Sequence, residues 1–206
     1  MNGMNWQEIH RLDQDITLWI NGFHSEISDV VWTFFSNIPV WIPMYVLIIA
    51  FILRRLGWRK GGIVVLSAIL TVTFCSLFSH YMKELTERLR PLLDTYMLEN
   101  SLHVLETGGK YTFFSAHSAN AFGLATSTYW GLRMDNRKYD RYAIFMYTWA
   151  TLVAVSRIFV GKHYMGDVMV GICVGIVAGL LFAWIARELS KRVVCERKEE
   201  KICRRM

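Results

Sequence analysis

The sequence predicts an all-α fold: a polytopic membrane helix bundle with about five transmembrane helices and an N-terminal amphipathic helix at the membrane interface. Composition is the first observation, because 53% of the 206 residues are hydrophobic and 19% are charged, whereas soluble domains carry about 25% charged residues. The second is that long stretches contain no Asp, Glu, Lys or Arg, and the third is that basic residues gather between them. This pattern excludes a disordered chain, and 4 cysteines in so long a chain exclude a disulfide scaffold.

Residues 1–29 are too polar to cross a membrane and lack the apolar core of a cleavable signal. Apolar side chains recur in them at helical spacing: Trp6, Ile9, Leu12, Ile16, Trp19 and Ile20. Such spacing indicates an amphipathic helix that lies in the plane of the membrane surface. We therefore predict an interfacial segment over residues 1–29, followed by the membrane domain.

Five stretches without charged residues follow this segment: residues 30–53, 61–82, 111–132, 142–156 and 168–186. A helix needs about 20 apolar residues to cross the hydrocarbon core. Four stretches meet this length directly, and the fourth in order meets it if the helix continues to Val160. The alternative is buried helices of a soluble protein, but those average about 11–12 residues and show a polar face. The sequence therefore predicts a membrane domain over residues 30–186.

Basic residues set the expected orientation of the spans. Residues 54–60, the loop after the third span and residues 187–206 together hold 16 of the 23 Lys and Arg residues. Because basic loops stay in the cytoplasm, we expect these segments to face inward, and residues 83–110 and 157–167 to face outward. Residues 187–206 then form a basic cytoplasmic tail near anionic lipid. Membrane topology thus explains the net charge of +6, and we expect no nucleic-acid partner.

Polar side chains gather at the predicted outer ends of the spans. In the segment KELTERLRP, Lys83 and Arg90 are seven residues apart, so on a helix they project from the same face. Pro91 forces a break soon after them. The alternative is an ordinary surface ion pair between Lys83 and Glu87.

Ser115 and His117 stand at the start of the third predicted span. Serine is a common helix cap, and the free backbone N–H groups of a first helical turn make a ready phosphate site. His117 lies just inside the apolar region, where an ionisable residue is a candidate for function. The alternative is an interfacial histidine that water satisfies.

Arg157 ends the fourth predicted span, and His163 and Asp167 are four residues apart at the entry to the fifth. A helical turn would stack the carboxylate on the imidazole, fix its tautomer and leave the other ring nitrogen free to attack or to accept a proton. A metal site would need more ligands than this pair, and neither His80 nor His103 has a spacing that favours zinc. We therefore expect no metal at this site.

Small residues recur every fourth position along the fifth span: Gly171, Gly175 and Gly179. Membrane helices use such stripes for close approach. The third span offers small residues at the same spacing, after His117: Ala121 and Ala125. We expect these two faces to pack together and to bring His117 near His163. The alternative is that the glycines only tune packing or dimerise the chain.

Together these residues resemble the type 2 phosphatidic acid phosphatase superfamily, the membrane lipid phosphate phosphatases. Its signature is K-x6-R-P, then P-S-G-H, then S-R-x5-H-x3-D. Residues 83–91 match the first motif, and residues 156–167 match the third in full. The second motif is matched at Ser115 and His117 only. There Phe114 replaces the proline and Ala116 the glycine, although the backbone N–H of Ala116 remains available.

The resemblance implies a metal-independent phosphatase that works through a phosphohistidine and needs no cofactor. It assigns His163 as the nucleophile, oriented by Asp167, and His117 as the general acid for the leaving group. It also assigns a set of residues to the phosphoryl oxygens: Lys83, Arg90, Arg157, Ser115 and Ala116. Three cations and a helix N-terminus supply the charge stabilisation that phosphoryl transfer requires.

The implied substrate is a membrane lipid phosphate or diphosphate, because a site at the outer interface can take the head group while the chains remain in the bilayer. Undecaprenyl diphosphate is the first choice, since a compact chain with a short outer loop suits a small head group. Lipid A, phosphatidylglycerol phosphate and phosphatidic acid are the alternatives. We expect a multi-pass protein of the bacterial inner membrane, with the site facing the periplasm or the outside.

A non-enzymatic membrane transporter is the alternative from another class. It would carry polar residues deep within several spans, near the middle of the bilayer. The ionisable residues of this chain stop at the outer ends of the spans instead. The sequence leaves the oligomeric state open.

Overall fold

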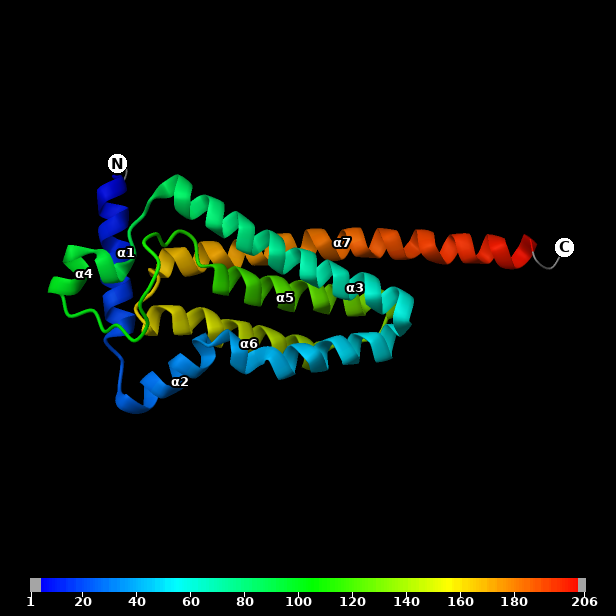
Figure 1. Cartoon of the computed structure of the whole chain (residues 1–206), viewed down its shortest axis with the longest axis horizontal. Coiled ribbons are helices and arrows are strands. Elements are labelled where there is room, and N and C mark those ends of the chain that lie inside the picture. The colour runs from blue at the N-terminus through cyan, green and yellow to red at the C-terminus, as the bar shows by residue number, and fades with distance from the viewer. Residues whose placement is uncertain (1–4, 204–206) are drawn as a thin grey trace.

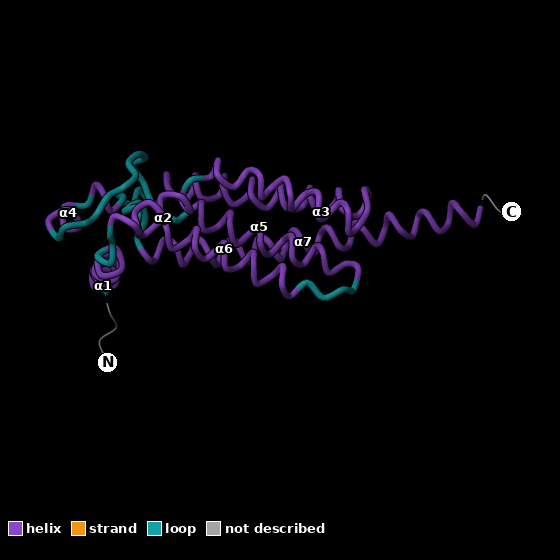
Figure 2. Tube along the Cα trace, turned by 90° about the horizontal axis from the view of Figure 1, so that it is seen from below, coloured by secondary structure: helices purple, strands orange, loops and turns teal. Residues whose placement is uncertain are grey.

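The structure, a computed structural model, describes residues 5–203, and the surroundings of side chains in residues 5–192. The described part of the chain is helical apart from its connecting segments (Figures 1 and 2). The elements follow in this order: α1 (Trp6–Asn21), α2 (Glu26–Ser36), η1 (Ile38–Trp41), α3 (Ile42–Thr86), η2 (Pro91–Leu93), α4 (Thr95–Glu99), α5 (Ala116–Leu132), η3 (Arg133–Asp135), α6 (Asp140–Phe159) and α7 (Met165–Cys203).

Helix α3 is a hairpin that runs the length of the bundle and back (Figure 1). The chain reverses at Gly57, whose backbone angles are non-helical, with φ 74° and ψ 167°. A residue with a Cβ adopts a positive φ only at a steric cost, which glycine avoids because it has no Cβ. Nothing lies within 4 Å of a Cβ built on Gly57, so the backbone angle, rather than space, requires glycine there. The basic turn predicted at residues 54–60 is therefore the tip of this hairpin.

The predicted boundary between residues 29 and 30 falls inside α2, and the division of the chain into an interfacial segment and a membrane domain stays a prediction. Ser25 begins α2 with a capping box, and the helix continues to Ser36. A proline stands at the start of η1 and another at the start of α3, where a missing N–H costs nothing. These caps divide the uncharged stretch 30–53 into three elements, which a count of charged residues does not reveal.

Three described helical segments are long and apolar enough to cross a membrane: Ile38–Thr86, Asp140–Phe159 and Met165–Arg192. The first contains both arms of the α3 hairpin. Helix α5 lies among them and packs against α3, α6 and α7. The all-α membrane bundle is thus confirmed, whereas the count of five spans stays a prediction.

The glycine stripe of α7 packs against α5, as predicted. A Cβ built on Gly175 would meet the carbonyl oxygen of Ala119 at 2.3 Å, and one on Gly179 would meet Thr126 Cβ at 2.7 Å. The face of α5 that meets the stripe therefore carries Ala119 and Thr126. The prediction that Ala121 and Ala125 form this face is wrong, because the residues of α5 and its cap that lie nearest to the stripe are others: Ser115, Ser118, Ala119, Gly123, Thr126 and Ser127.

Helix α1 lies across one end of the bundle, crosswise to the long helices (Figures 1 and 2). The residues that it buries are polar: Gln14, Thr17 and Asn21. Large apolar side chains on it are exposed: Trp6, Ile9, Leu12, Ile16 and Trp19. This distribution suits a helix whose polar face contacts the protein and whose apolar face contacts lipid. We call the end of the bundle formed by α1, α4 and residues 100–115 the site end.

Helix α7 continues from Met165 to Cys203 and extends beyond the other helices (Figure 1). The predicted start of a tail at residue 187 is therefore not a break in secondary structure. Residues 204–206 of that predicted tail lie outside the described residues.

Close packing of α5 on α7 gives a testable prediction. We expect Gly175→Ala to lower the Tm of the purified protein, because the new Cβ would overlap the backbone of Ala119. Overpacking costs about 1–3 kcal/mol, and each kcal/mol corresponds to about 2–4 °C in a chain of this size. Gly62→Ala in α3 is the matched control, since a Cβ there meets nothing within 4 Å. Equal Tm values for the two variants would contradict this packing.

Candidate active site

Lys83 and Arg90 reach the site from two different kinds of backbone. Helix α3 ends at Thr86, because Glu87 adopts the left-handed conformation and donates its N–H to Lys83 O. Arg90 is extended, as the residue before a proline tends to be. The prediction that one helix face carries both side chains is therefore wrong. They still converge, since Lys83 lies within electrostatic reach of Arg90, Arg157 and Asp167.

The extended segment after α3 pairs with a second extended segment just before α5. Arg90 N donates to Lys110 O at 3.2 Å, and Thr112 N donates to Arg88 O at 2.9 Å. Leu89 and Tyr111 face each other between these bonds in an isolated antiparallel bridge. This short pairing carries Arg88, Arg90 and Thr112 to the start of α7.

Ser115 caps α5, as predicted, and is fully buried. Its hydroxyl oxygen accepts from Ser118 Oγ at 3.0 Å, and its N–H donates to Asp167 O at 3.1 Å. Ala116 is the first residue of α5 and His117 the second. The start of α5 is thus held directly against the start of α7, which places His117 within electrostatic reach of His163, Lys83 and Arg157.

Arg157 and His163 are separated by a tight turn at the end of α6. Gly161 has φ +75°, the left-handed conformation that commonly ends a helix. A Cβ there would meet His103 O at 2.7 Å, so the turn also needs the small residue. After it, His163 N donates back to Arg157 O at 3.2 Å.

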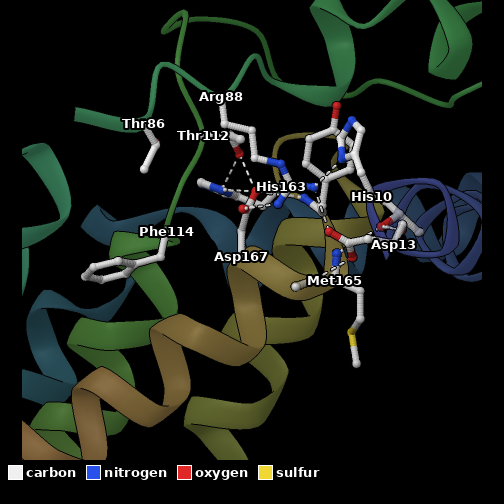
Figure 3. Close-up of polar contacts among 12 residues, drawn as sticks. His10, Asp13, Thr86, Arg88, Thr112, Phe114, His163, Met165 and Asp167 are labelled. Atoms are coloured by element: carbon white, nitrogen blue, oxygen red, sulfur yellow. Dashed lines mark hydrogen bonds and ion pairs between the residues drawn. The ribbon is translucent and has the colours of Figure 1, made fainter. Parts of the chain in front are cut away.

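His163 and Asp167 are close, but they do not stack on one helical turn as predicted. Helix α7 begins at Met165, so His163 precedes it, and its Nδ1 lies 3.6 Å from Asp167 Oδ2. That distance is too long for a hydrogen bond. Thr112 bridges the two groups (Figure 3): its hydroxyl donates to Asp167 Oδ2 at 2.5 Å and lies 2.9 Å from His163 Nδ1.

The bridge fixes the tautomer of His163. Because the single proton of the Thr112 hydroxyl goes to Asp167, its oxygen must accept from Nδ1–H of the imidazole. Burial lowers the pKa of His163 to about 3, although Asp167 acts to raise it. The ring is therefore neutral at physiological pH, with a proton on Nδ1 and a lone pair on Nε2.

Arg88 holds the other oxygen of Asp167 and links it to α1 (Figure 3). Its Nη1 donates to Asp167 Oδ1 at 2.8 Å, and its Nη2 donates to Asp13 Oδ2 at 2.7 Å. Burial acts to lower the pKa of Arg88, but the two carboxylates outweigh it and raise the pKa. Asp13 also accepts from Gly166 N at 2.7 Å, so α1 caps α7 at the same point.

Arg157 is 1% exposed, and a carboxylate from the loop before α5 balances its charge. Glu106 Oε2 accepts from Arg157 Nη2 at 3.4 Å and from Lys162 Nζ at 3.1 Å. Ser36 of α2 contacts both Arg157 and Glu106. Burial acts to raise the pKa of Glu106, but Arg157, Ser36 and Lys162 together hold it below its ordinary value.

Arg90 is also buried, at 8% exposed, beneath a glycine-containing loop. Its Nη1 donates to Lys162 O at 3.2 Å, and a Cβ on Gly109 would meet its Nη2 at 2.9 Å. The Nε atoms of Arg90 and Arg157 are buried and have no hydrogen-bond partner among the described residues. Two buried guanidinium groups thus keep donors for a further anion, which fits the predicted phosphate site.

An apolar cavity opens beside this cluster. It has a volume of about 390 Å³, and Ser36 and His117 line it at the site end, while Ile52 and Val65 line it towards the α3 turn. Ligand cavities commonly measure about 300–1,000 Å³ and combine apolar walls with a few polar groups. The cavity therefore connects the polar cluster with the apolar interior of the bundle.

All the residues selected from the sequence thus meet at the site end, and the structure adds three that the sequence did not select: Arg88, Glu106 and Thr112. Arg88 is one of the basic residues in an outward segment, and only its place within the first motif set it apart. Glu106 and Thr112 carry no local signal, because their partners are 51 to 56 residues away along the chain.

A membrane helix bundle with buried cations and two imidazoles at one end defines a class of membrane proteins that act on phosphate groups. The model of the PAP2 superfamily matches residues 61–191 of this chain. The chain therefore belongs to the PAP2 superfamily and is a membrane lipid phosphatase, an enzyme rather than a transporter.

Two relatives cover most of the chain. The lipid A 4'-phosphatase of Bacteroides thetaiotaomicron is 30% identical over 185 residues, which are 88% of this chain and 80% of the relative. The lipid A 4'-phosphatase of Porphyromonas gingivalis is 28% identical over 178 residues, which are 83% of this chain and 71% of the relative.

Two solved structures share the fold. A PAP2-type phosphatidylglycerolphosphate phosphatase from Bacillus subtilis has a TM-score of 0.71 and 21% identity, and the match covers 90% of this chain and 89% of that one. Aquifex aeolicus LpxE has a TM-score of 0.64 and 23% identity, and the match covers 82% of this chain and 92% of that one.

The Thr112 bridge predicts different kcat values for two conservative substitutions of Thr112. We expect Thr112→Val to lower kcat on a lipid phosphate about 10–100-fold with little change in KM, because two buried partners lose about 1–3 kcal/mol of hydrogen bonding. Thr112→Ser keeps the hydroxyl and should restore most of the rate. Steady-state kinetics of both variants provide the measurement, and a valine variant as fast as the serine variant would exclude the bridge from the reaction.

The ion pairs of Glu106 predict a pH-dependent stability. Its pKa in the folded protein is lower than the ordinary value of 4.5, so ionised Glu106 stabilises the fold above pH 4.5, and this contribution is lost as pH falls through the folded-state pKa. We expect Glu106→Gln to lower the Tm at pH 7 and the difference from wild type to shrink in acid. Thermal melts from pH 7 to about pH 3, through the window below pH 4.5, measure it; a difference that grows in acid contradicts the pairing.

Proposed function

We propose that this chain removes a phosphate group from a phosphorylated glycolipid of the lipid A type, through a phosphohistidine at His163. The observation that carries the reaction is the state of His163: its Nδ1 is held by Thr112, which leaves Nε2 as the free nitrogen. The two lipid A 4'-phosphatases that match most of the chain support the substrate.

The first step transfers the phosphoryl group to the enzyme. The lone pair of His163 Nε2 attacks phosphorus, and the bond from phosphorus to the lipid oxygen breaks. His117, which takes up a proton when the anionic phosphate binds beside it, gives that proton to the lipid oxygen. The phosphorylated imidazole carries a positive charge while Nδ1 keeps its proton. Asp167, 3.6 Å from Nδ1 and buried, stabilises that charge without accepting the proton.

The second step releases phosphate. Water attacks phosphorus from the side that the lipid alcohol has left, neutral His117 accepts a proton from it, and the electrons of the P–N bond return to Nε2. Both histidines regain their starting states. Lys83, Arg90 and Arg157, with the hydroxyl of Ser115 and the N–H of Ala116, are the groups that we assign to the equatorial phosphoryl oxygens in both steps.

The substrate arrives from the membrane in this proposal. The cavity of about 390 Å³ beside His117 is apolar along most of its length, which suits part of an acyl chain. The exposed apolar face of α1 supports a position of the cations at the membrane edge, where a phosphate head group lies. We further propose the bacterial inner membrane, with the site facing the periplasm, on the distribution of basic residues.

Undecaprenyl diphosphate, the first choice from sequence, stays a prediction. The argument for it was the shortness of the outer loop, which does not discriminate between head groups that extend into water. Similarity over 88% of the chain to a lipid A 4'-phosphatase is the more specific observation. We therefore place lipid A first and keep undecaprenyl diphosphate, phosphatidylglycerol phosphate and phosphatidic acid as comparison substrates.

A substrate panel tests the proposal. Purified protein in detergent micelles with EDTA should release inorganic phosphate from lipid A with the highest kcat/KM, and vanadate should inhibit. A preference for undecaprenyl diphosphate would overturn the substrate and leave the reaction intact.

Phosphohistidine formation has its own test. Denaturation in alkali during turnover of ³²P-labelled lipid should trap label on wild-type protein and on His80→Ala, an exposed histidine that serves as control. His163→Ala should trap none and show activity near background. Asp167→Asn should fold and react slowly. Unchanged turnover in His163→Ala would show that the assignment of the nucleophile is wrong.

A further inference from the structure

A second cluster of metal-ligating side chains lies at the site end, apart from the phosphate cluster. His24 comes from the turn between α1 and α2, Asp29 from the first turns of α2, and His103 from the loop after α4. One ligand atom of each lies within 4.8 Å of the others. His103 Nε2 is 2.8 Å from Asp29 Oδ2, and the His24 and His103 rings stack with centroids 3.8 Å apart.

Two of the three groups are held in place by the backbone around them. Asn21, the last residue of α1, binds both backbone groups of His103: its Nδ2 donates to His103 O at 3.0 Å and its Oδ1 accepts from His103 N at 2.8 Å. Asp29 sits in a helix whose start is fixed by the Ser25 capping box. His24 is exposed, and its ring stacks on that of His103.

The carboxylate of Asp29 can accept more hydrogen bonds than the described side chains around it donate. Its Oδ2 contacts His103, while its Oδ1 is buried and has no hydrogen-bond partner in the part of the chain that the structure describes. A buried carboxylate oxygen without a donor is costly. A cation between the carboxylate and the two imidazoles would meet this need.

We propose that His24, Asp29 and His103 form a binding site for a zinc ion, with water as the fourth ligand. Two imidazole nitrogens and one carboxylate oxygen are ligands that zinc takes at about 2.0–2.2 Å in sites with three protein ligands. Such bonds set neighbouring ligand atoms about 3.3 Å apart in a tetrahedron. The cluster therefore contracts from 4.8 Å, and His103 Nε2 moves slightly away from Asp29 Oδ2.

The His24 ring must also rotate for zinc to bind. Its plane and that of His103 are 5° from parallel, and the lone pairs of parallel stacked rings cannot meet at one ion. Rotation of His24 costs little because the residue is exposed and lies in a turn. The sequence spacing did not predict this site, since His103 lies 74 residues after Asp29.

Zinc at this position would stabilise the conformation of the loop that carries Glu106. Leu105 N and Glu106 N both donate to Val160 O, at 3.2 and 3.3 Å, so the segment 103–106 follows the turn before Lys162 and His163. The ion would tie this segment to the α1–α2 turn. It stands outside the phosphate cluster, and the chemistry proposed for His163 does not involve it.

Metal binding to the full-length protein in detergent tests the site. We expect one zinc ion per chain by calorimetric titration, a rise in Tm that EDTA reverses, and d–d absorption of Co²⁺ with nitrogen ligands when cobalt replaces zinc. His24→Ala, at an exposed position that should not affect folding, should weaken zinc binding about 100-fold or more and abolish the Tm rise. Asp29→Asn should weaken it while preserving shape.

Two control variants make the assignment specific. His80→Ala, an exposed histidine outside the cluster, and His163→Ala, in the phosphate cluster, should both keep the zinc affinity and the Tm rise. Zinc binding that survives in His24→Ala but is lost in His163→Ala would place the ion at the phosphate cluster and overturn the proposal. Absence of binding to wild type would also overturn it and leave the cluster as a stacked, hydrogen-bonded pair.

Discussion

Charge balance among buried groups is the constraint on which the site depends. A guanidinium group removed from water costs several kcal/mol unless an anion lies beside it, and this chain buries Arg90 and Arg157 at the site end of the bundle. Glu106 lies against Arg157, while Asp167 lies within the electrostatic field of Arg90. Because both guanidinium groups still keep a buried Nε without a partner among the described residues, the balance leaves room for the additional charge of a phosphate.

The sequence predicted which residues form this site better than it predicted the backbone that holds them. Lys83, Arg90, Arg157, His117 and His163 were found through motif spacing, and the structure brings all of them together. Their spacing did not reveal the backbone that joins them, since Lys83 ends a helix and Arg90 is extended. A spacing of seven residues is compatible with one continuous helix and with a helix followed by an extended segment. The left-handed Glu87 between the two residues and Pro91 after them determine which of the two forms.

Long-range partners account for the rest of what the sequence could not predict. Thr112 and Glu106 act through groups far away in the chain, and a threonine or a glutamate in a loop has no pattern of its own. The start of the first apolar helix was missed for a related reason: the uncharged residues 30–36 look like membrane helix, whereas they belong to α2, and the apolar segment with α3 begins at Ile38. The glycine stripe, by contrast, was predictable because its small residues recur at every fourth position along one helix, whereas the face of α5 that it meets, at Ala119, was not.

Helix α1 explains why so polar a site is stable beside lipid. Asp13 and Thr17 accept from the first N–H groups of α7, and Asn21 donates to the last carbonyl groups of α6, so polar helix ends that lipid cannot satisfy are satisfied by one crosswise helix. Arg88 forms ion pairs with both Asp13 and Asp167. Arg88 therefore partly compensates the negative charge of Asp167, which Thr112 links to His163. A helix that the sequence indicates only as a surface anchor thus contributes to the electrostatic environment of Asp167 and His163.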